Sequence, residues 1–311
     1  MALSTWLTLK RLRLSNQIEL IDSHFAFPEG FAANRLSKIL NIPYVVTLRG
    51  ARDTDTIGTS REQMLKTAII DAHAIIGVSD SLRKFAINVG ALPIRARAIT
   101  NGVDTKVFFP EDRLIARSRL NIEANIPVLI SVGSLIPLKG HHRVVELLPA
   151  LKVKFPTIKL LIVGGSTGFG DTTALIRDLA KQLDVEDNVV LCGRISPNEI
   201  RWYLSAANLF TLATENEGWP NALMEALACG IPIVTTNVGG NSEIVSNKLF
   251  GEVVEYWEPI KFTNAIIERL NSDTGSYERT RFGENSSWEE TGKKVVEVWD
   301  DVLASYHDTQ Q

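Results

Sequence analysis

The sequence predicts an α/β protein built from two doubly wound parallel-sheet domains that face each other across a cleft. Short, almost continuous Val/Ile/Leu runs recur along the chain, and most are followed by a longer amphipathic stretch. Unbroken apolar runs are typical of strands buried on both faces of a parallel sheet, and the helices between them form the crossovers. At 311 residues, the chain is long enough for two domains of ordinary size.

The predicted elements fall into two groups separated by a charged stretch at 108–126. The predicted strands are 18–24, 43–48, 74–79 and 97–100 before it, and 127–133, 158–164, 188–192, 208–213, 231–236 and 251–254 after it. The clearest helical patterns are 141–154, 172–183, 197–206, 220–229 and 288–305. We therefore predict a first domain at 1–115, a second at 116–285 and a C-terminal helix at 286–311 that packs back toward the first domain.

Composition narrows the class of protein. Hydrophobic residues make up 45% and charged residues 22%, as in globular proteins, and a net charge of −3 gives no field that favours nucleic acid. The two cysteines, Cys192 and Cys229, fit neither a disulfide framework nor a metal site, which favours a cytoplasmic protein. No apolar run approaches the roughly 18–20 residues of a membrane span.

A basic cluster near the start leaves one alternative open. Lys10, Arg11 and Arg13 follow the first apolar stretch, which is the reverse of a secretory signal. A solvated helix face is the favoured interpretation of this cluster. Together with Trp6 and Leu7, however, it resembles a patch that holds anionic lipid, so peripheral contact with the inner face of a membrane is the alternative.

Binding chemistry is concentrated in four loops that follow strands of the second group. Because the carboxyl ends of parallel strands meet at one edge of a sheet, we expect these loops to converge there. The loops contain SVGSLIPLKGHH (131–142), VGGSTGFGD (163–171), TENEGWPNALMEALACG (214–230) and TNVGGNSEIV (236–245). Their glycines allow the backbone to approach a ligand closely, and Lys139 in the first of them supplies a movable cation.

The third loop places two glutamates around the start of a helix. Pro220 fits a first helical turn, so Glu217 precedes the helix and Glu225 lies inside it. The backbone N–H groups of Gly218, Trp219 and Asn221 then lie at the positive end of the helix dipole. Such an end suits an anion or a set of sugar hydroxyls.

Each candidate also has a plain structural explanation. Glu225 alone could form a solvated helix face, Lys139 a surface lysine, and His24, at the end of a strand, a core histidine with satisfied hydrogen bonds.

We do not predict a metal site at either of two short polar motifs. Asp53 and Asp55 match an Asp-x-Asp clasp, but such short matches are mostly solvated loops. His141 and His142 are adjacent, and we expect both on the surface.

Four stretches resemble a known family: EGWPNALMEALACGIPIVTTNVGGNSEIV, VGSLIPLKG, ITNGVDTKVF and IPYVVTLRG. They are similar to the retaining nucleotide-sugar glycosyltransferases of family 4, also called group 1, which have the two-domain GT-B fold. The first stretch carries the family's Glu-x7-Glu signature, and the similarity covers essentially the whole chain. It implies transfer of a sugar from a nucleotide-diphosphate sugar to a glycan or lipid-linked acceptor, with no metal and no cofactor.

The resemblance also assigns roles to residues. It implies that Glu217 holds hydroxyls of the donor sugar and that Glu225 binds the two hydroxyls of the nucleotide ribose. Lys139 would neutralise the leaving diphosphate, and His24 matches a first-domain histidine near the donor sugar. The resemblance places a further set around the donor: Gly133, Ser134, Gly218, Trp219, Pro220 and Asn221.

The chain departs from the family pattern in two places. Ser134 stands where family members commonly have arginine, so Arg194 or Arg49 is the expected substitute. Arg49 and Arg52 are also the acceptor-side candidates. Family members usually begin with several strand–helix units ahead of the stretch IELIDSHF, so we expect an incomplete, marginally stable first domain. Its strand at 18–24 would present a bare edge that a partner chain could complete.

Three functions therefore stay open. The favoured one is an active glycosyltransferase of the hexosyltransferase type. The second is a catalytically silent sugar-nucleotide-binding protein or partner subunit, favoured by the short first domain and Ser134. The third is a Rossmann oxidoreductase or a GT-B epimerase. It is disfavoured because no G-x-G-x-x-G opens the first strand of either domain and no acid–base set for an epimerase is evident.

Overall fold

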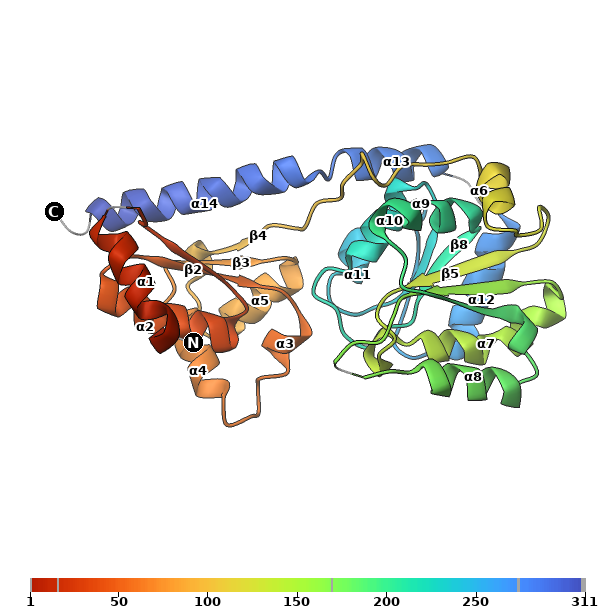
Figure 1. Ribbon diagram of the computed structural model, residues 1–311, viewed down its shortest axis with the longest axis horizontal. Helices are drawn as coiled ribbons and strands as arrows, with labels where there is room; N and C mark the ends of the chain where they lie inside the picture. Colours follow the sequence, from red (N-terminus) through yellow and green to blue (C-terminus); the bar gives the residue numbers. More distant parts are fainter. Residues whose placement is uncertain (1, 16, 169, 273–274, 309–311) are drawn as a thin grey trace. The chain divides into compact units, whose positions relative to one another are not determined.

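The computed structural model describes residues 2–15, 17–168, 170–272 and 275–308. The chain divides into two compact units, one formed by 1–101, 217–219 and 288–311, the other by 102–216 and 220–287. Each unit contains a parallel sheet flanked by helices, one of four strands and one of six (Figure 1). The predicted α/β class and the two parallel sheets are confirmed.

The first unit has the strand order β1-β2-β3-β4. Its strands are β1 (Ile21–His24), β2 (Tyr44–Leu48), β3 (Ala74–Gly77) and β4 (Ala96–Ala98), each within a few residues of its predicted position. Its helices and helical turns are α1 (Ala2–Leu14), η1 (Ala26–Gly30), α2 (Phe31–Leu40), α3 (Ala51–Thr54), α4 (Glu62–Ile70), α5 (Asp80–Val89), η2 (Pro93–Arg95) and α14 (Trp288–Asp308).

The C-terminal helix is part of the first unit's core. Val298 and Val302 of α14 are buried in a cluster with Val45, Ile76 and Ile99 of the sheet region. Burying one such side chain contributes roughly 1.5–3 kcal/mol, so this contact ties the helix firmly to the sheet. A second cluster joins α1 to α2, with Leu36, Leu40 and Ile42 packed against Trp6, Leu9, Ile18 and Ile21.

The second unit has the strand order β10-β9-β8-β5-β6-β7. Its strands are β5 (Val128–Val132), β6 (Lys159–Val163), β7 (Val189–Gly193), β8 (Leu209–Leu212), β9 (Ile233–Thr236) and β10 (Gly251–Val254). Its helices and turns are α6 (Arg113–Arg119), η3 (Pro137–Lys139), α7 (His141–Lys154), α8 (Thr173–Gln182), η4 (Glu186–Asn188), α9 (Pro197–Ala206), α10 (Asn221–Ala228), α11 (Asn241–Ile244), α12 (Pro259–Asn271) and α13 (Ser276–Glu284). The order reverses at β5, which lies between β6 and β8, and ligands of such sheets bind at this reversal beyond the carboxyl ends of the strands.

One prediction about the first unit is wrong. Asp53 is fully buried rather than solvated, and its carboxylate accepts backbone hydrogen bonds from Ala26 (2.8 Å), Arg49 (2.7 Å) and Gly50 (3.3 Å). Burial raises the pKa of this carboxyl, and the three N–H donors oppose that rise. Asp53 therefore fixes the loop after β2, whereas Asp55 is exposed as expected.

Candidate functional site

The loops after β5, β6 and β7 enclose a cavity of about 420 Å³ at the carboxyl edge of the second sheet. Three residues predicted around the donor, Gly133, Ser134 and Arg194, line it together. The remaining lining residues are Val132, Val163, Gly164, Gly165, Thr167, Ile195 and Ile200. The lining therefore combines apolar side chains with two hydroxyls and the exposed guanidinium of Arg194.

Two of the glycines bring the loops after β5 and β6 into direct contact. A Cβ on Gly164 would lie 1.8 Å from the carbonyl oxygen of Gly133, so no side chain fits there. The N–H of Leu135 donates to the carbonyl of Gly165 (3.0 Å). The backbone itself thus forms this side of the cavity, and close approach of a ligand to it stays a prediction.

Lys139 is positioned by the junction between the loops after β5 and β8. The Thr214 hydroxyl donates to the carbonyl of Leu138 (2.9 Å), and the Glu215 N–H donates to the same oxygen (3.0 Å). The Lys139 side chain is half-buried, and its Cδ lies 3.4 Å from where a Cβ of Gly133 would stand. The lysine stem therefore runs along the Gly133 edge of the cavity.

Gly140, directly after Lys139, is required by the same junction. It has φ +68°, and an added Cβ would lie 1.9 Å from the carbonyl oxygen of Ala213. We expect Gly140→Ala to destabilise the unit by more than the about 1–2 kcal/mol of a left-handed alanine, because the loop must also move. Urea denaturation measures this. Gly193→Ala is the matched control, since Gly193 has φ +71° with no atom within 4 Å of the Cβ position. Equal losses in both variants would contradict a steric role for Gly140.

His141 is a correction to the predicted surface position. It is 1% exposed, and its Nδ1 lies 2.9 Å from the Ser131 hydroxyl, because the first residue of α7 packs against strand β5. Burial lowers the pKa of His141 to about 4, so the imidazole is neutral at pH 7. Its Nε2 has no hydrogen-bond partner among the described residues. His142 is half-buried.

The loop after β8 leads into helix α10, which carries the second glutamate. The helix begins at Asn221, with Pro220 as its N-cap rather than in its first turn. Glu225 is half-buried on a helix whose other side chains are largely buried, and burial raises the pKa of its carboxyl to about 7. Glu225 is therefore not on a solvated face.

Residues 217–219 fall in the first unit, where Gly218 and Trp219 are buried and Glu217 is half-buried. In the second unit, Pro220 is buried and Asn221 is exposed. The loop after β9 joins the same edge, since the Thr236 hydroxyl donates to the carbonyl of Thr214 (2.6 Å) and the Asn241 amide donates to Thr235 and Thr236 (both 2.9 Å). All four predicted loops are thus linked. The sequence did not single out Thr214, Thr236 or Asn241. Threonines at the ends of predicted strands could have indicated hydroxyls that donate to loop carbonyls.

The first unit has a separate cavity of about 340 Å³ at the carboxyl edge of its sheet. Predicted residues His24 and Arg49 line it, together with Asp22 and Asn101, which the sequence did not indicate. His24 Nε2 lies 3.8 Å from Asp22 Oδ2. Burial raises the pKa of Asp22, and the charges of His24 and Arg49 oppose that rise.

Arg52 is not among the residues that line this cavity. It pairs with Glu29 (2.9 Å), and its guanidinium stacks over the ring of Phe25 at 4.6 Å. The structure thus separates the two acceptor-side candidates.

Comparison with known families fits this geometry. A model described as "Glycosyl transferases group 1" matches residues 112–288, and one described as "Glycosyltransferase Family 4" matches residues 1–107. The chain belongs to the group 1 glycosyltransferases. The predicted family is therefore confirmed.

Individual members of this family are similar to this chain over much of its length. D-inositol 3-phosphate glycosyltransferase of Segniliparus rotundus is 30% identical over 222 residues, covering 69% of this chain and 47% of that protein. The enzyme of the same name from Corynebacterium glutamicum is 26% identical over 308 residues, covering 92% and 73%. The chain thus spans about half the length of the first of these relatives.

Solved structures confirm the GT-B fold. Sucrose-phosphate synthase from Thermosynechococcus elongatus superposes with a TM-score of 0.79 at 20% identity, covering 97% of this chain and 79% of that chain. Anabaena Alr3699/HepE in complex with UDP-glucose superposes with a TM-score of 0.82 at 19% identity, covering 95% and 82%.

Proposed function

We propose that this chain is a retaining glycosyltransferase that moves a sugar from a nucleotide-diphosphate sugar to a glycan or lipid-linked acceptor. The observation that carries the proposal is the linked set of loops at the strand-order reversal of the second sheet. These loops present Lys139 and the cavity lined by Ser134 and Arg194, and the loop after β8 leads into helix α10, which carries Glu225. The Anabaena neighbour was solved with UDP and with UDP-glucose, which makes a uridine nucleotide the first donor to test.

The proposed chemistry needs positive groups at the diphosphate. Breaking the glycosyl–phosphate bond leaves charge on the diphosphate and gives the sugar oxocarbenium character. Lys139 and the N-terminus of α10 supply preorganised positive charge, which is usually the largest catalytic contribution, so we propose that no metal or cofactor is needed. Glu217 orients the sugar and tolerates its positive charge, and we propose that the acceptor attacks from the face that the diphosphate leaves.

Ser134 removes one cation that the family commonly has at this site. Arg194 lines the same cavity as Ser134, so we propose Arg194 as the substitute on the donor side. His24 and Arg49 share the cavity of the first unit, where we propose that they serve the sugar and the acceptor. A catalytically silent sugar-nucleotide-binding protein or partner subunit is the second candidate, because Ser134 itself carries no charge.

We also propose a cytoplasmic protein with peripheral contact to the inner membrane face. Helix α1 exposes Leu7 (62%) and Leu14 (77%) beside the exposed side chains of Lys10 and Arg11, the pattern of a surface that adsorbs to anionic lipid. None of the helices in the described ranges is long and apolar enough to cross a bilayer. A partner chain that extends the first sheet beyond β1 stays part of the proposal.

A thermal-shift screen tests the donor site directly. UDP, GDP, ADP, dTDP and their common sugars would be added to wild type and to Glu225→Gln. A ligand at about 100 times its Kd should stabilise the protein by roughly 2.7 kcal/mol. We expect one nucleotide to stabilise wild type by this amount and Glu225→Gln by clearly less, and release of that nucleotide from its sugar in the presence of acceptor to show turnover. Binding without turnover would favour the silent protein, and no binding by any nucleotide would contradict both candidates.

A further inference from the structure

Strand β7 is an apolar edge of the second sheet. Within the described part of the chain it pairs with β6 alone. Its sequence is VVLCG, and Val190 is 40% exposed. An edge strand presents a row of backbone N–H and C=O groups to any strand that can lie beside it, and proteins usually protect such edges with charges, proline or a covering element. None of the residues of β7 is charged or proline.

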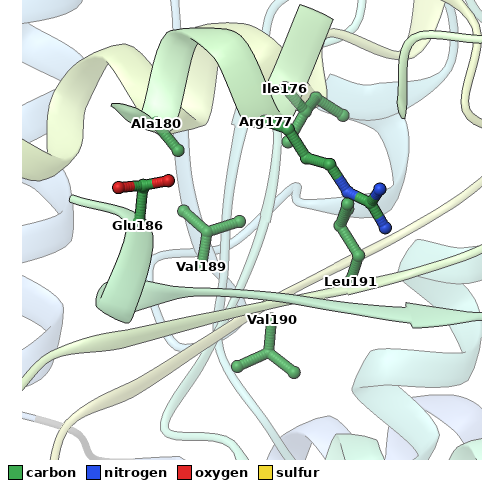
Figure 2. A pocket seen from close by; sticks show the side chains of 7 residues that line it. All are labelled: Ile176, Arg177, Ala180, Glu186, Val189, Val190 and Leu191. Atoms are coloured by element: carbon green, nitrogen blue, oxygen red, sulfur yellow. The ribbon is translucent and has the colours of Figure 1, made fainter. Parts of the chain in front are cut away.

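The flanking helices leave both faces of this strand hollowed. On the face toward α8 is a cavity of about 450 Å³, whose side chains are shown in Figure 2. Its lining residues are Ile176, Arg177, Ala180, Glu186, Val189, Val190 and Leu191. A second cavity, of about 440 Å³, is lined by Val190 and Cys192 of the strand and by Tyr203, Leu120 and Ile122 among others. Val189 and Leu191 point toward α8 and Val190 points away, so apolar side chains are accessible on both faces (Figure 2).

The charges beside the strand are arranged so that the edge complements itself. Glu186 opens the short turn η4 that leads into the strand, and Arg177 of α8 lies toward the Leu191 end of the same cavity (Figure 2). Both side chains are exposed, and neither forms an ion pair with another described residue. A two-fold axis perpendicular to the strand exchanges its two ends. It would therefore bring Glu186 of one copy opposite Arg177 of the other, twice.

We propose that two copies of this chain associate by antiparallel pairing of their β7 strands. The pairing continues the second sheet across a two-fold axis and satisfies the edge backbone groups of both copies. It removes Val189, Val190 and Leu191 from water and places one acid–base pair on each side of the axis. A second copy fits better than an unrelated peptide because the chain itself carries both Glu186 and Arg177, whose charges complement each other across the two-fold axis. The proposal does not depend on the nature of the donor or acceptor.

Size-exclusion chromatography with light scattering, over a protein concentration series, tests this pairing. We expect wild type to reach twice the 34.4 kDa chain mass. Val190→Lys should hold the protein at the single-chain mass, because a charge on the strand would be buried without a partner. Lys154→Glu, an exposed charge reversal on α7 of the same unit, is the control and should dimerise like wild type.

A charge swap tests the two-fold geometry itself. Arg177→Glu and Glu186→Arg should each weaken the dimer by tenfold or more. The double variant should restore it, because opposite charges then face each other again. These positions are exposed, so this test holds even if Val190→Lys fails to fold. A single-chain mass for wild type at every concentration would overturn the proposal. So would a dimer that is unaffected by Val190→Lys and by the single charge reversals.

Discussion

Lys139→Ala should lower turnover by roughly 100- to 1,000-fold while leaving the fold intact, because removing one preorganised group that stabilises developing charge has about that effect. The side chain runs along Gly133 at the edge of the cavity, and the loop that carries it is held by backbone contacts to Thr214 and Glu215. Truncation at Cβ therefore removes the ammonium and keeps both hydrogen bonds to the Leu138 carbonyl. Initial rates of nucleotide release, at saturating donor and acceptor, measure the effect.

Comparing the effects on kcat and on donor affinity distinguishes a lysine that stabilises the transition state from one that only binds the donor. If Lys139 stabilises charge that develops as the bond breaks, kcat falls more than donor affinity. Lys139→Arg, which keeps the charge, should recover part of the rate. Lys154→Ala removes an exposed lysine from helix α7 and should be neutral. A loss in Lys139→Ala confined to donor affinity would contradict the catalytic role.

Glu225→Gln should weaken binding of the donor nucleotide by about 10- to 100-fold, because a hydrogen bond to a charged group is worth roughly 1.5–3 kcal/mol. Under the proposed function the ionised carboxylate accepts hydrogen bonds from both ribose hydroxyls, and the amide offers only one acceptor oxygen. Since the pKa of Glu225 lies at about 7, wild-type affinity should also rise as pH increases through 7. Isothermal titration with the nucleoside diphosphate at pH 6 and pH 8 measures both effects, and the pH dependence should be smaller in the variant, where the terminal phosphate of the nucleotide still titrates.

The same substitution should stabilise the protein without ligand at alkaline pH. Burial raises the pKa of the folded-state carboxyl from 4.5 to about 7. Between these values the folded state binds more protons than the unfolded state, so the free energy of unfolding falls as pH rises through this window. At pH 8 the ionised carboxyl costs about 3 kcal/mol, which the amide avoids. Denaturation at pH 5 and pH 8 should show this gain only at the higher pH.

Glu284→Gln makes the same chemical change on an exposed side chain and should alter neither stability nor binding. If Glu225→Gln proved destabilising at pH 8, the carboxylate would be held by a partner and the role of burial would be refuted. We expect Glu225→Gln to be more stable at pH 8 and to bind the nucleotide more weakly, because the Glu225 carboxylate serves ligand recognition at a cost to stability.

The secondary structure, and the edge of the second sheet at which the four candidate loops meet, follow from local sequence. Continuous Val/Ile/Leu runs located the strands to within a few residues, and α7 and α9 have the predicted bounds. This works because a parallel strand buries both of its faces, so its consecutive residues are nearly all apolar. Glycines after strands predicted loops whose backbone can approach a ligand closely, whereas the contact between the loops at Gly133 and Gly164 became evident only in the structure.

The environment of individual polar groups was decided by the tertiary structure alone. The sequence predicted that Asp53 and His141 lie on the surface, yet both are buried. Asp53 accepts a hydrogen bond from Ala26, which is distant along the chain, and His141 packs against Ser131 of strand β5. The raised pKa of Glu225 arises from the packing around α10 in the same way. Desolvation depends on every atom within a few ångströms of the group, whereas a sequence pattern records only neighbours along the chain. The sequence by itself determined which residues are the candidates for the chemistry, and the tertiary structure decided how far polar groups such as Asp53, His141 and Glu225 are removed from water.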